Sequence, residues 1–480
     1  MCNLRLLIID NVHIPESLNH VSTDLRCLEW FGYSSKCLPS NFQPKELVEL
    51  NLRFSEIKYL WEGVKCLDKL KCNDLKNSQN LTQTPDFTGV PRLETLYLSW
   101  CRNLVEIHSS IGQLRRLVVL DLEGCESLTN LPSMTTKMES LTILNLCYCS
   151  KIRKIPAFNG IMKSLSELYL GKTAIEKLPE SIMCLTSLTL LNLRDCKNLK
   201  CLTFYTFSLR SLEKLVVSGC SKLARRPVNS WELHRLKELD LSGNSFVTMP
   251  ISIWQLLKLE ALDLSGCSKL KSLPLLPLTV RYINAKDCHS MIPLPSQPTE
   301  SRAKVTFKIL HSYLQGLLYR KNTKRKENES GTEFQLIIPG DEIPLWLSYQ
   351  SIGNSISIGL PPNWCNDGWM GFALCARLVG HNSFKISVSE KAFGFRARVI
   401  ALGDMPQSHY ASEIFFGPMT FDSSHIWILY VSRNDWFAIV QNGKCSKIEV
   451  VFETSSPGLN VGKCGVSLVY TQDMEEHCII

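Results

Sequence analysis

Some groups of residues in this 480-residue sequence have the types that catalysis uses, but they lack the spacing. Gly171, Lys172 and Thr173 end like a phosphate-binding loop, yet Ser166 stands where G-x-x-x-x-G-K-[ST] needs its first glycine. The motifs G-x-S-x-G, H-E-x-x-H and G-x-G-x-x-G are absent, and the ten histidines form no H-x-x-x-H metal pair. The sequence therefore predicts no catalytic residue, no cofactor and no metal site, and a protein that is not an enzyme.

Twenty cysteines are the other chemically distinctive feature. Seven of them recur at one position of a repeated pattern, and that position also accepts valine, tyrosine, serine, threonine and asparagine. Such a position serves packing and hydrogen bonding rather than a bridge, and no C-x-x-C pair points to zinc. We expect these cysteines to be buried and reduced: Cys101, Cys125, Cys149, Cys196, Cys220, Cys267 and Cys288.

The residues that could form a site have the types of a protein-binding surface. Polar and aromatic side chains flank the inward leucines of short predicted strands, and alternation along a strand turns them toward solvent. Tyrosine and arginine among them often anchor protein interfaces. The candidate contact residues are Glu49, Asn51, Arg53, Asp74, Lys76, Tyr97, Ser99, Asp121, Glu123, Asn145, Tyr169, Asn192, Arg194, Asp240, Asp263, Asn284 and Lys286.

Repeats must position these residues. In residues 259–274, LEALDLSGCSKLKSLP, the apolar residues follow L-x-x-L-x-L-x-x-C-x-x-L, which is leucine-rich-repeat spacing. One such unit cannot bury its own apolar edge and becomes stable only when stacked on copies of itself. The pattern predicts an α/β leucine-rich-repeat solenoid of 13 repeats over residues 1–295, a horseshoe with a parallel sheet on its concave side. Its first apolar position recurs at Leu4, Leu25, Leu47, Leu70, Leu93, Leu117, Leu141, Leu165, Leu188, Leu212, Leu236, Leu259 and Val280.

A second region follows the repeats. An apolar stripe predicts a helix over 305–320, and residues 321–333 predict a flexible, partly basic linker, so that 296–333 connects two domains. Nine short apolar runs then predict an all-β antiparallel sandwich over 334–472, with 473–480 as a tail. The expected strands are 334–338, 355–360, 370–379, 384–389, 396–402, 425–431, 436–441, 447–452 and 464–470, and the expected core tryptophans are Trp346, Trp364, Trp369, Trp427 and Trp436.

Charge and hydropathy limit the partners and the compartment. Lys and Arg number 53 against 45 Asp and Glu, and the resulting +8 is mild for this length, which argues against nucleic acid or an anionic membrane. No run of eighteen apolar residues and no secretory leader occurs, so we expect a cytoplasmic protein. Four basic linker residues allow two interpretations, a nuclear-import signal or a solvated hinge: Lys321, Lys324, Arg325 and Lys326.

Particular stretches resemble a known family. PGDEIPLWLSYQSIGNSISIGLPPNWCNDGWMGFALCA, with HIWILYV, KIEVVFE and KCGVSLVY, resembles the C-terminal jelly-roll and immunoglobulin-like (C-JID) domain of plant nucleotide-binding leucine-rich-repeat immune receptors of the Toll/interleukin-1-receptor class. Repeats such as LVVLDLEGCESLTNLP resemble the same family. The resemblance implies recognition of a pathogen effector or a guarded host protein by the repeats and the β-domain. In such receptors a Toll-type domain hydrolyses NAD and a nucleotide-binding domain drives assembly, but their catalytic glutamate and nucleotide-binding loop have no matching position here.

Three functional hypotheses remain open from the sequence. The leading hypothesis is a sensor module without chemistry of its own. The first repeat begins almost at Met1 with nothing to cover its end, which favours a shortened receptor that regulates or acts as a decoy for a full-length immune receptor, or a fragment of a longer receptor. The third is a substrate receptor of a ubiquitin ligase, which ranks last because no F-box-like helical segment precedes the repeats.

Overall fold

The structure of the chain is a computed structural model. It groups residues Met1–Asn244 and Ser245–Ile480 into two compact units, here called the N-terminal and C-terminal units. The structure describes residues 3–12, 18, 21–132, 138–158, 162–202, 206, 208–223, 233–249, 251–273, 276–277, 279–291, 309–311, 313–315, 318, 333–380, 393–402, 409–416, 424–440, 445–454 and 459–476.

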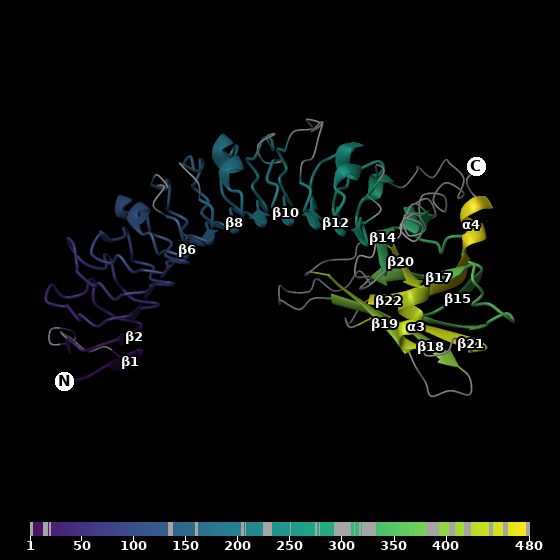
Figure 1. The fold of residues 1–480 in the computed structure, drawn as a ribbon, viewed down its shortest axis with the longest axis horizontal. Coiled ribbons are helices and arrows are strands. Elements are labelled where there is room, and N and C mark those ends of the chain that lie inside the picture. Colours follow the sequence, from purple (N-terminus) through teal and green to yellow (C-terminus); the bar gives the residue numbers. More distant parts are fainter. Residues whose placement is uncertain are drawn as a thin grey trace. The chain divides into compact units, whose positions relative to one another are not determined.

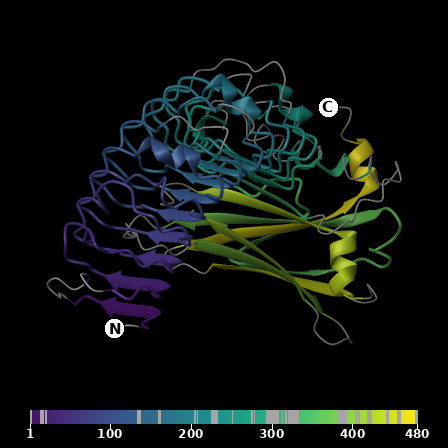
Figure 2. The ribbon, with the colours of Figure 1, turned by 60° about the vertical axis from the view of Figure 1, so that its left-hand side comes forward.

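The N-terminal unit is a stack of short parallel strands joined by irregular arms (Figure 1). Each strand from β2 to β11 contains an inward residue, usually leucine, that is almost fully buried, while the neighbours of this residue are mostly half-exposed; β1 has no buried residue. Consecutive strands pair in parallel and in register, so equivalent repeat positions form columns along the sheet (Figure 2). The strands are β1 (Leu6–Asp10), β2 (Cys27–Phe31), β3 (Glu49–Asn51), β4 (Cys72–Asp74), β5 (Thr95–Tyr97), β6 (Val119–Asp121), β7 (Ile143–Asn145), β8 (Glu167–Tyr169), β9 (Leu190–Asn192), β10 (Lys214–Val216) and β11 (Glu238–Asp240), and the 3-10 helices η1 (Ser109–Gln113) and η2 (Glu180–Cys184) lie in the arms.

The cysteine position of the repeat is a hydrogen-bonding position, as predicted. The Cys101 thiol donates to the Leu75 carbonyl oxygen at 3.1 Å, and the Cys149 thiol donates to that of Leu122 at 3.1 Å. Asn244 fills the same position and donates its amide to the Val217 oxygen at 2.9 Å. Each of these side chains is buried, and each ties one repeat to the one before it. Any short buried donor therefore fits here.

The C-terminal unit contains two more repeat strands and a β-sandwich. The first sheet has the order β14–β20–β17–β22–β15 and the second β16–β21–β18–β19. Buried Trp364, Trp369, Trp427 and Trp436 lie in the apolar core of the sandwich. The elements are η3 (Ile251–Gln255), β12 (Ala261–Asp263), β13 (Tyr282–Asn284), η4 (His289–Met291), β14 (Phe334–Pro339), β15 (Tyr349–Ile352), β16 (Ser355–Gly359), β17 (Trp369–Gly380), β18 (Phe393–Leu402), β19 (His409–Phe416), β20 (His425–Ser432), α3 (Arg433–Ile439), β21 (Lys447–Thr454), β22 (Leu459–Tyr470) and α4 (Thr471–Glu476).

The last repeat strand pairs directly with the first strand of the sandwich. Strand β13 pairs in parallel with β14, with Ile283 opposite Leu336, so the repeat sheet and the first sandwich sheet share a ladder. Beside this ladder, Nε2 of the fully buried His425 lies 3.1 Å from Oδ1 of Asp287. Burial alone would raise the pKa of Asp287, but its hydrogen bond to His425 and the nearby Lys286 ammonium outweigh this and lower it. Backbone pairing and the contact between His425 and Asp287 thus connect the sandwich to the last repeats.

Some predicted elements differ from those observed. Residues 436–441 were expected as a strand, but α3 covers most of them, because Ser432 caps the helix by accepting from the Asp435 N–H while its hydroxyl donates to the Asp435 carboxylate. Strands β15 and β19 were not predicted. The predicted core residue Trp346 is half-buried and lines a cavity of about 340 Å³. The expected strand 384–389 lies outside the described residues, as does most of the linker 321–333.

The predicted helix at 305–320 is observed where the chain is described. Residues 309–311, 313–315 and 318 are helical. Buried Tyr313 stacks on Phe334 of β14 with ring centroids 4.6 Å apart. No helix among the described residues is both long enough and apolar enough to span a bilayer.

Candidate functional site

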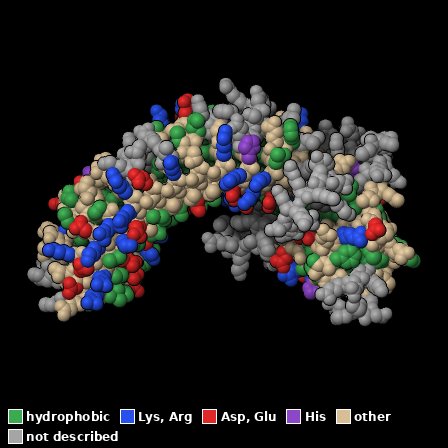
Figure 3. Space-filling model, in the orientation of Figure 1, with side chains coloured by type: hydrophobic (Ala, Val, Ile, Leu, Met, Phe, Trp, Pro, Cys, Tyr) green, Lys and Arg blue, Asp and Glu red, His purple; other side chains and the backbone are tan. Residues whose placement is uncertain are grey.

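The concave sheet of the N-terminal unit presents three columns of side chains. The first column precedes the inward residue of each strand, the second follows it, and the third lies two residues beyond the second. The candidate contact residues come from the second and third columns, apart from Glu49 in the first. All lie on β3–β13 or just after them, as the repeat frame requires. Figure 3 shows acidic and basic side chains interspersed over the visible face of this unit, with no large patch of one sign.

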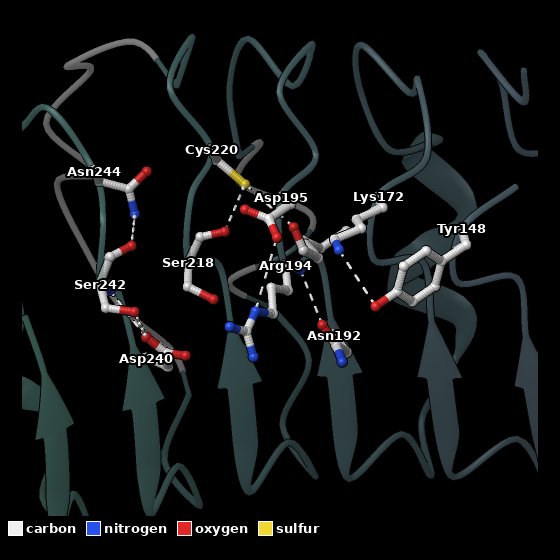
Figure 4. A network of polar contacts seen from close by, with 11 residues as sticks. Tyr148, Lys172, Asn192, Arg194, Asp195, Ser218, Cys220, Asp240, Ser242 and Asn244 are labelled. Atoms are coloured by element: carbon white, nitrogen blue, oxygen red, sulfur yellow. Dashed lines mark hydrogen bonds and ion pairs between the residues drawn. The ribbon is translucent and has the colours of Figure 1, made fainter. Parts of the chain in front are cut away.

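Most second-column residues have a structural task. An aspartate or asparagine there accepts the backbone N–H two residues later, which closes the end of the strand; in Figure 4, Asn192 accepts from the Arg194 N–H. A backbone N–H needs such a partner once the ladder ends. The residues that accept this bond, at 2.8–3.2 Å, are Asp74, Asp121, Asn145, Asn192, Asp240, Asp263 and Asn284.

Two tyrosines break this second-column pattern. The Lys76 ammonium lies 4.0 Å from the ring centroid of Tyr97. The pKa of Tyr97 is raised, and burial is the largest cause. Tyr169 donates its hydroxyl to the Glu167 carboxylate at 2.7 Å, and burial, followed by that bond, raises its pKa to about 12. Both rings are half-exposed. Neither side chain is needed to close its strand, so both are available for contacts across the concave face.

The charged candidates differ in their exposure. Arg53 and Arg194 are exposed, and Nη2 of Arg53 lies 2.8 Å from Oδ2 of Asp74. Asp74 itself is 2% exposed, so it can act on a partner only through Arg53. Asn51 and Ser99 are also buried, and so are Asn284 and Lys286 in the C-terminal unit, at 2% and 1% exposure. These five side chains contribute to the repeats rather than to an open surface.

Two sets of exposed residues were missed by the sequence reasoning. The first column presents half-exposed apolar side chains, Val119, Ile143 and Leu190, in the middle of the sheet. Directly after the third column, Trp100 and Tyr148 adopt positive φ, where L-amino acids are disfavoured. The signal for the second set was present in the sequence, because glycine occupies the same slot in several other repeats.

The described residues offer little for catalysis. Burial raises the pKa of the thiols of Cys101, Cys149 and Cys220 to about 12, which keeps them protonated and poorly nucleophilic. Within the described ranges, no three His, Cys, Asp or Glu side chains gather as a metal site would require. What the arrangement does provide is a long, mixed-polarity sheet with tyrosines on it, which suits contact with another macromolecule.

Comparison with protein families agrees with this architecture. The C-JID domain matches residues 338–475, and leucine-rich repeats described as disease resistance protein RPS4B-like match residues 137–232. Two further leucine-rich-repeat families match 46–65 and 235–256. The chain therefore contains leucine-rich repeats and a C-terminal region that matches the C-JID domain. Both regions are similar to those of plant disease resistance proteins.

Individual relatives show the same similarity. The chain is 29% identical to the disease resistance protein RPS4B of Arabidopsis thaliana, over 99% of this chain and 43% of the relative. It is 29% identical to the disease resistance-like protein DSC1 of Arabidopsis thaliana over 76% of this chain and 37% of the relative. It thus spans less than half the length of these curated relatives.

Two solved structures are also similar to parts of the chain. The protein LIC12759 of Leptospira interrogans is 24% identical, with a TM-score of 0.34, over 59% of this chain and 84% of that chain. A functional domain of InlJ from Listeria monocytogenes is 16% identical, with a TM-score of 0.35, over 55% of this chain and 59% of that chain.

Proposed function

We propose that this chain is the non-catalytic recognition region of a plant intracellular immune receptor, and that its concave sheet binds a pathogen effector or a guarded host protein. The observation that carries the proposal is the contrast within the second column. Aspartates and asparagines there close the strands, whereas Tyr97 and Tyr169 are free of that task and lie half-exposed on the sheet. Tyrosine combines a large apolar ring with a polar tip, so it is favoured at interfaces.

Arg194 lies in the third column and adds an exposed cation to the proposed surface. Its Nε lies 3.9 Å from the Asp195 carboxylate, and its side chain is 69% exposed. An exposed pair of this kind contributes little to folding, so the guanidinium can exchange its partner for a carboxylate on an incoming protein. Together these three side chains occupy the strands and strand ends of repeats β5, β8 and β9.

Replacement of Tyr97, Tyr169 or Arg194 by alanine is expected to weaken the binding of a matching effector by about tenfold or more for each anchor, because interface energy concentrates in a few aromatic and arginine side chains. The measurement is calorimetric titration of the purified chain with candidate effectors. Tyr59→Ala is the matched control, since Tyr59 lies in an arm and not on a strand. Undiminished affinity in all three variants would show that the concave sheet is not the binding surface.

A further inference from the structure

A single repeat slot in the N-terminal unit has left-handed backbone geometry. It directly follows the third concave column, where the chain turns out of the strand. Gly32, Gly124, Gly219 and Gly243 occupy it with φ of 64° to 72°. Glycine suits this slot because it has no Cβ to clash. Other repeats place side chains there under strain: Asn11, Phe54, Asn77, Trp100, Tyr148, Lys172 and Asp195, with φ of 51° to 63°.

Three of these strained residues and one further cation form a group at the surface, here called the Trp100 cluster: Trp100, Tyr148, Lys172 and Arg102. The Trp100 and Tyr148 rings lie 5.4 Å apart although a whole repeat separates them. They can meet because the intervening slot is Gly124, where a Cβ would stand 2.6 Å from the Trp100 ring. A side chain in that repeat would drive the rings apart.

Each ring of the Trp100 cluster has a cation on it. The Lys172 ammonium lies 4.3 Å from the Tyr148 ring centroid and donates to the Tyr148 hydroxyl at 3.3 Å, as Figure 4 shows. The Arg102 guanidinium lies 5.6 Å from the Trp100 ring and 3.4 Å from the Glu126 carboxylate. Among the described residues, no carboxylate forms an ion pair with Lys172. The Lys172 ammonium has three N–H donors, and only one of them is used here, so it can bind an anionic group of a partner.

Folding does not account for this strain. Tyr148 is 38% exposed, and Arg102 and Lys172 are exposed, so the cluster contributes little to the core. The neighbouring Cys101 and Cys149 already tie their repeats together. Glycine would serve the fold at the same slot, as it does in four other repeats of this unit. Strained, exposed side chains that packing does not require are characteristic of binding sites.

We propose that the Trp100 cluster binds an acidic segment of the protein partner, with an apolar side chain against the paired rings and carboxylates on Lys172 and Arg102. The inference rests on the proposed recognition function and specifies the chemistry of the partner. Charge complementarity favours this occupant, because a cation flanks the ring pair at each end. A ring pair with a cation on each face also matches the aromatic and arginine composition of interface anchors.

The test is selection of a phage-displayed library of twelve-residue peptides on the immobilised full chain. Selected peptides are then titrated against Trp100→Gly and Tyr148→Gly. Both variants install the residue that the slot already holds in other repeats, so their melting temperatures should stay within about 2 °C of wild type or rise. Asn77→Gly makes the same backbone change outside the cluster and is the matched control.

The expected peptides carry aspartate or glutamate beside an aromatic or aliphatic residue, bind at least about tenfold more weakly to both glycine variants, and bind more weakly in high salt. Some selected peptides could bind the glycine variants like wild type but lose affinity for Tyr97→Ala. That result would overturn the Trp100 cluster as the binding site, while supporting the concave sheet as the binding surface. The proposal would also be overturned if the selected peptides lacked carboxylates, or if no peptide bound the wild-type chain more tightly than the glycine variants. A twenty-nucleotide oligothymidine that binds wild type but not Trp100→Gly would overturn it as well, because the rings would then bind a nucleic acid rather than a peptide.

Discussion

Replacing Asn73 by leucine is expected to stabilise the N-terminal unit by about 2–4 kcal/mol. Asn73 is the inward residue of β4 and is fully buried, yet neither its amide nitrogen nor its amide oxygen has a hydrogen-bond partner among the described residues. In the parallel register it lies between Leu50 and Leu96, so the site has the shape of a leucine position. The substitution removes an unsatisfied buried amide and adds apolar contact.

Denaturant unfolding followed by circular dichroism measures this effect. The reverse exchange on the adjacent strand, Leu96→Asn, is the control and should destabilise by a similar amount, because it creates the same unsatisfied amide. A lower unfolding midpoint for Asn73→Leu would contradict the assignment, since it would mean that the amide is satisfied in the folded protein.

Replacing Lys65 by methionine is expected to destabilise the same unit by about 2–4 kcal/mol. Lys65 is only 7% exposed, and its ammonium donates at 3.0 Å to the carbonyl oxygens of Pro39, Ser40 and Phe42. Methionine keeps the length of the side chain but donates nothing, so it leaves three acceptors of the preceding arm without their partner. Burial lowers the pKa of Lys65, which indicates how far its charge has been withdrawn from water.

Lys69→Met is the matched control for that substitution. The Lys69 ammonium pairs with the Glu46 carboxylate at 2.6 Å, but the pair is exposed, so we expect a change below about 1 kcal/mol. Equal unfolding midpoints for the two variants would contradict the structural role of Lys65.

The repeats were predictable because their signal is local. The leucine spacing places every strand from β1 to β13, and the mixed residues of the cysteine slot correctly indicate a buried donor. The left-handed slot was less apparent, because Trp100 and Tyr148 look like ordinary arm residues unless aligned with Gly124 and Gly219. Sequence spacing also cannot separate an aspartate that closes a strand from one that meets a partner.

The C-terminal unit was harder because its decisive contacts are distant in sequence. Strand β14 pairs with β13 across about fifty residues, and His425 reaches Asp287 across 138. Periodicity within a window cannot reveal such pairs. By contrast, α3 had a local signal, since Ser432 and Asp435 have the spacing of a helix cap, but the apolar run after them resembles a strand.

The proposed function requires that the concave sheet of the N-terminal unit contacts a protein partner. Hydroxyl-radical footprinting of the full chain, with and without a bound candidate effector, tests it by the modification rate of each exposed ring. The rates of Tyr97 and Tyr169 should fall on binding, while those of Tyr59 in an arm and of Trp254, which is 48% exposed in η3, stay unchanged. Unchanged rates at both concave tyrosines in the presence of a bound effector would contradict the claim.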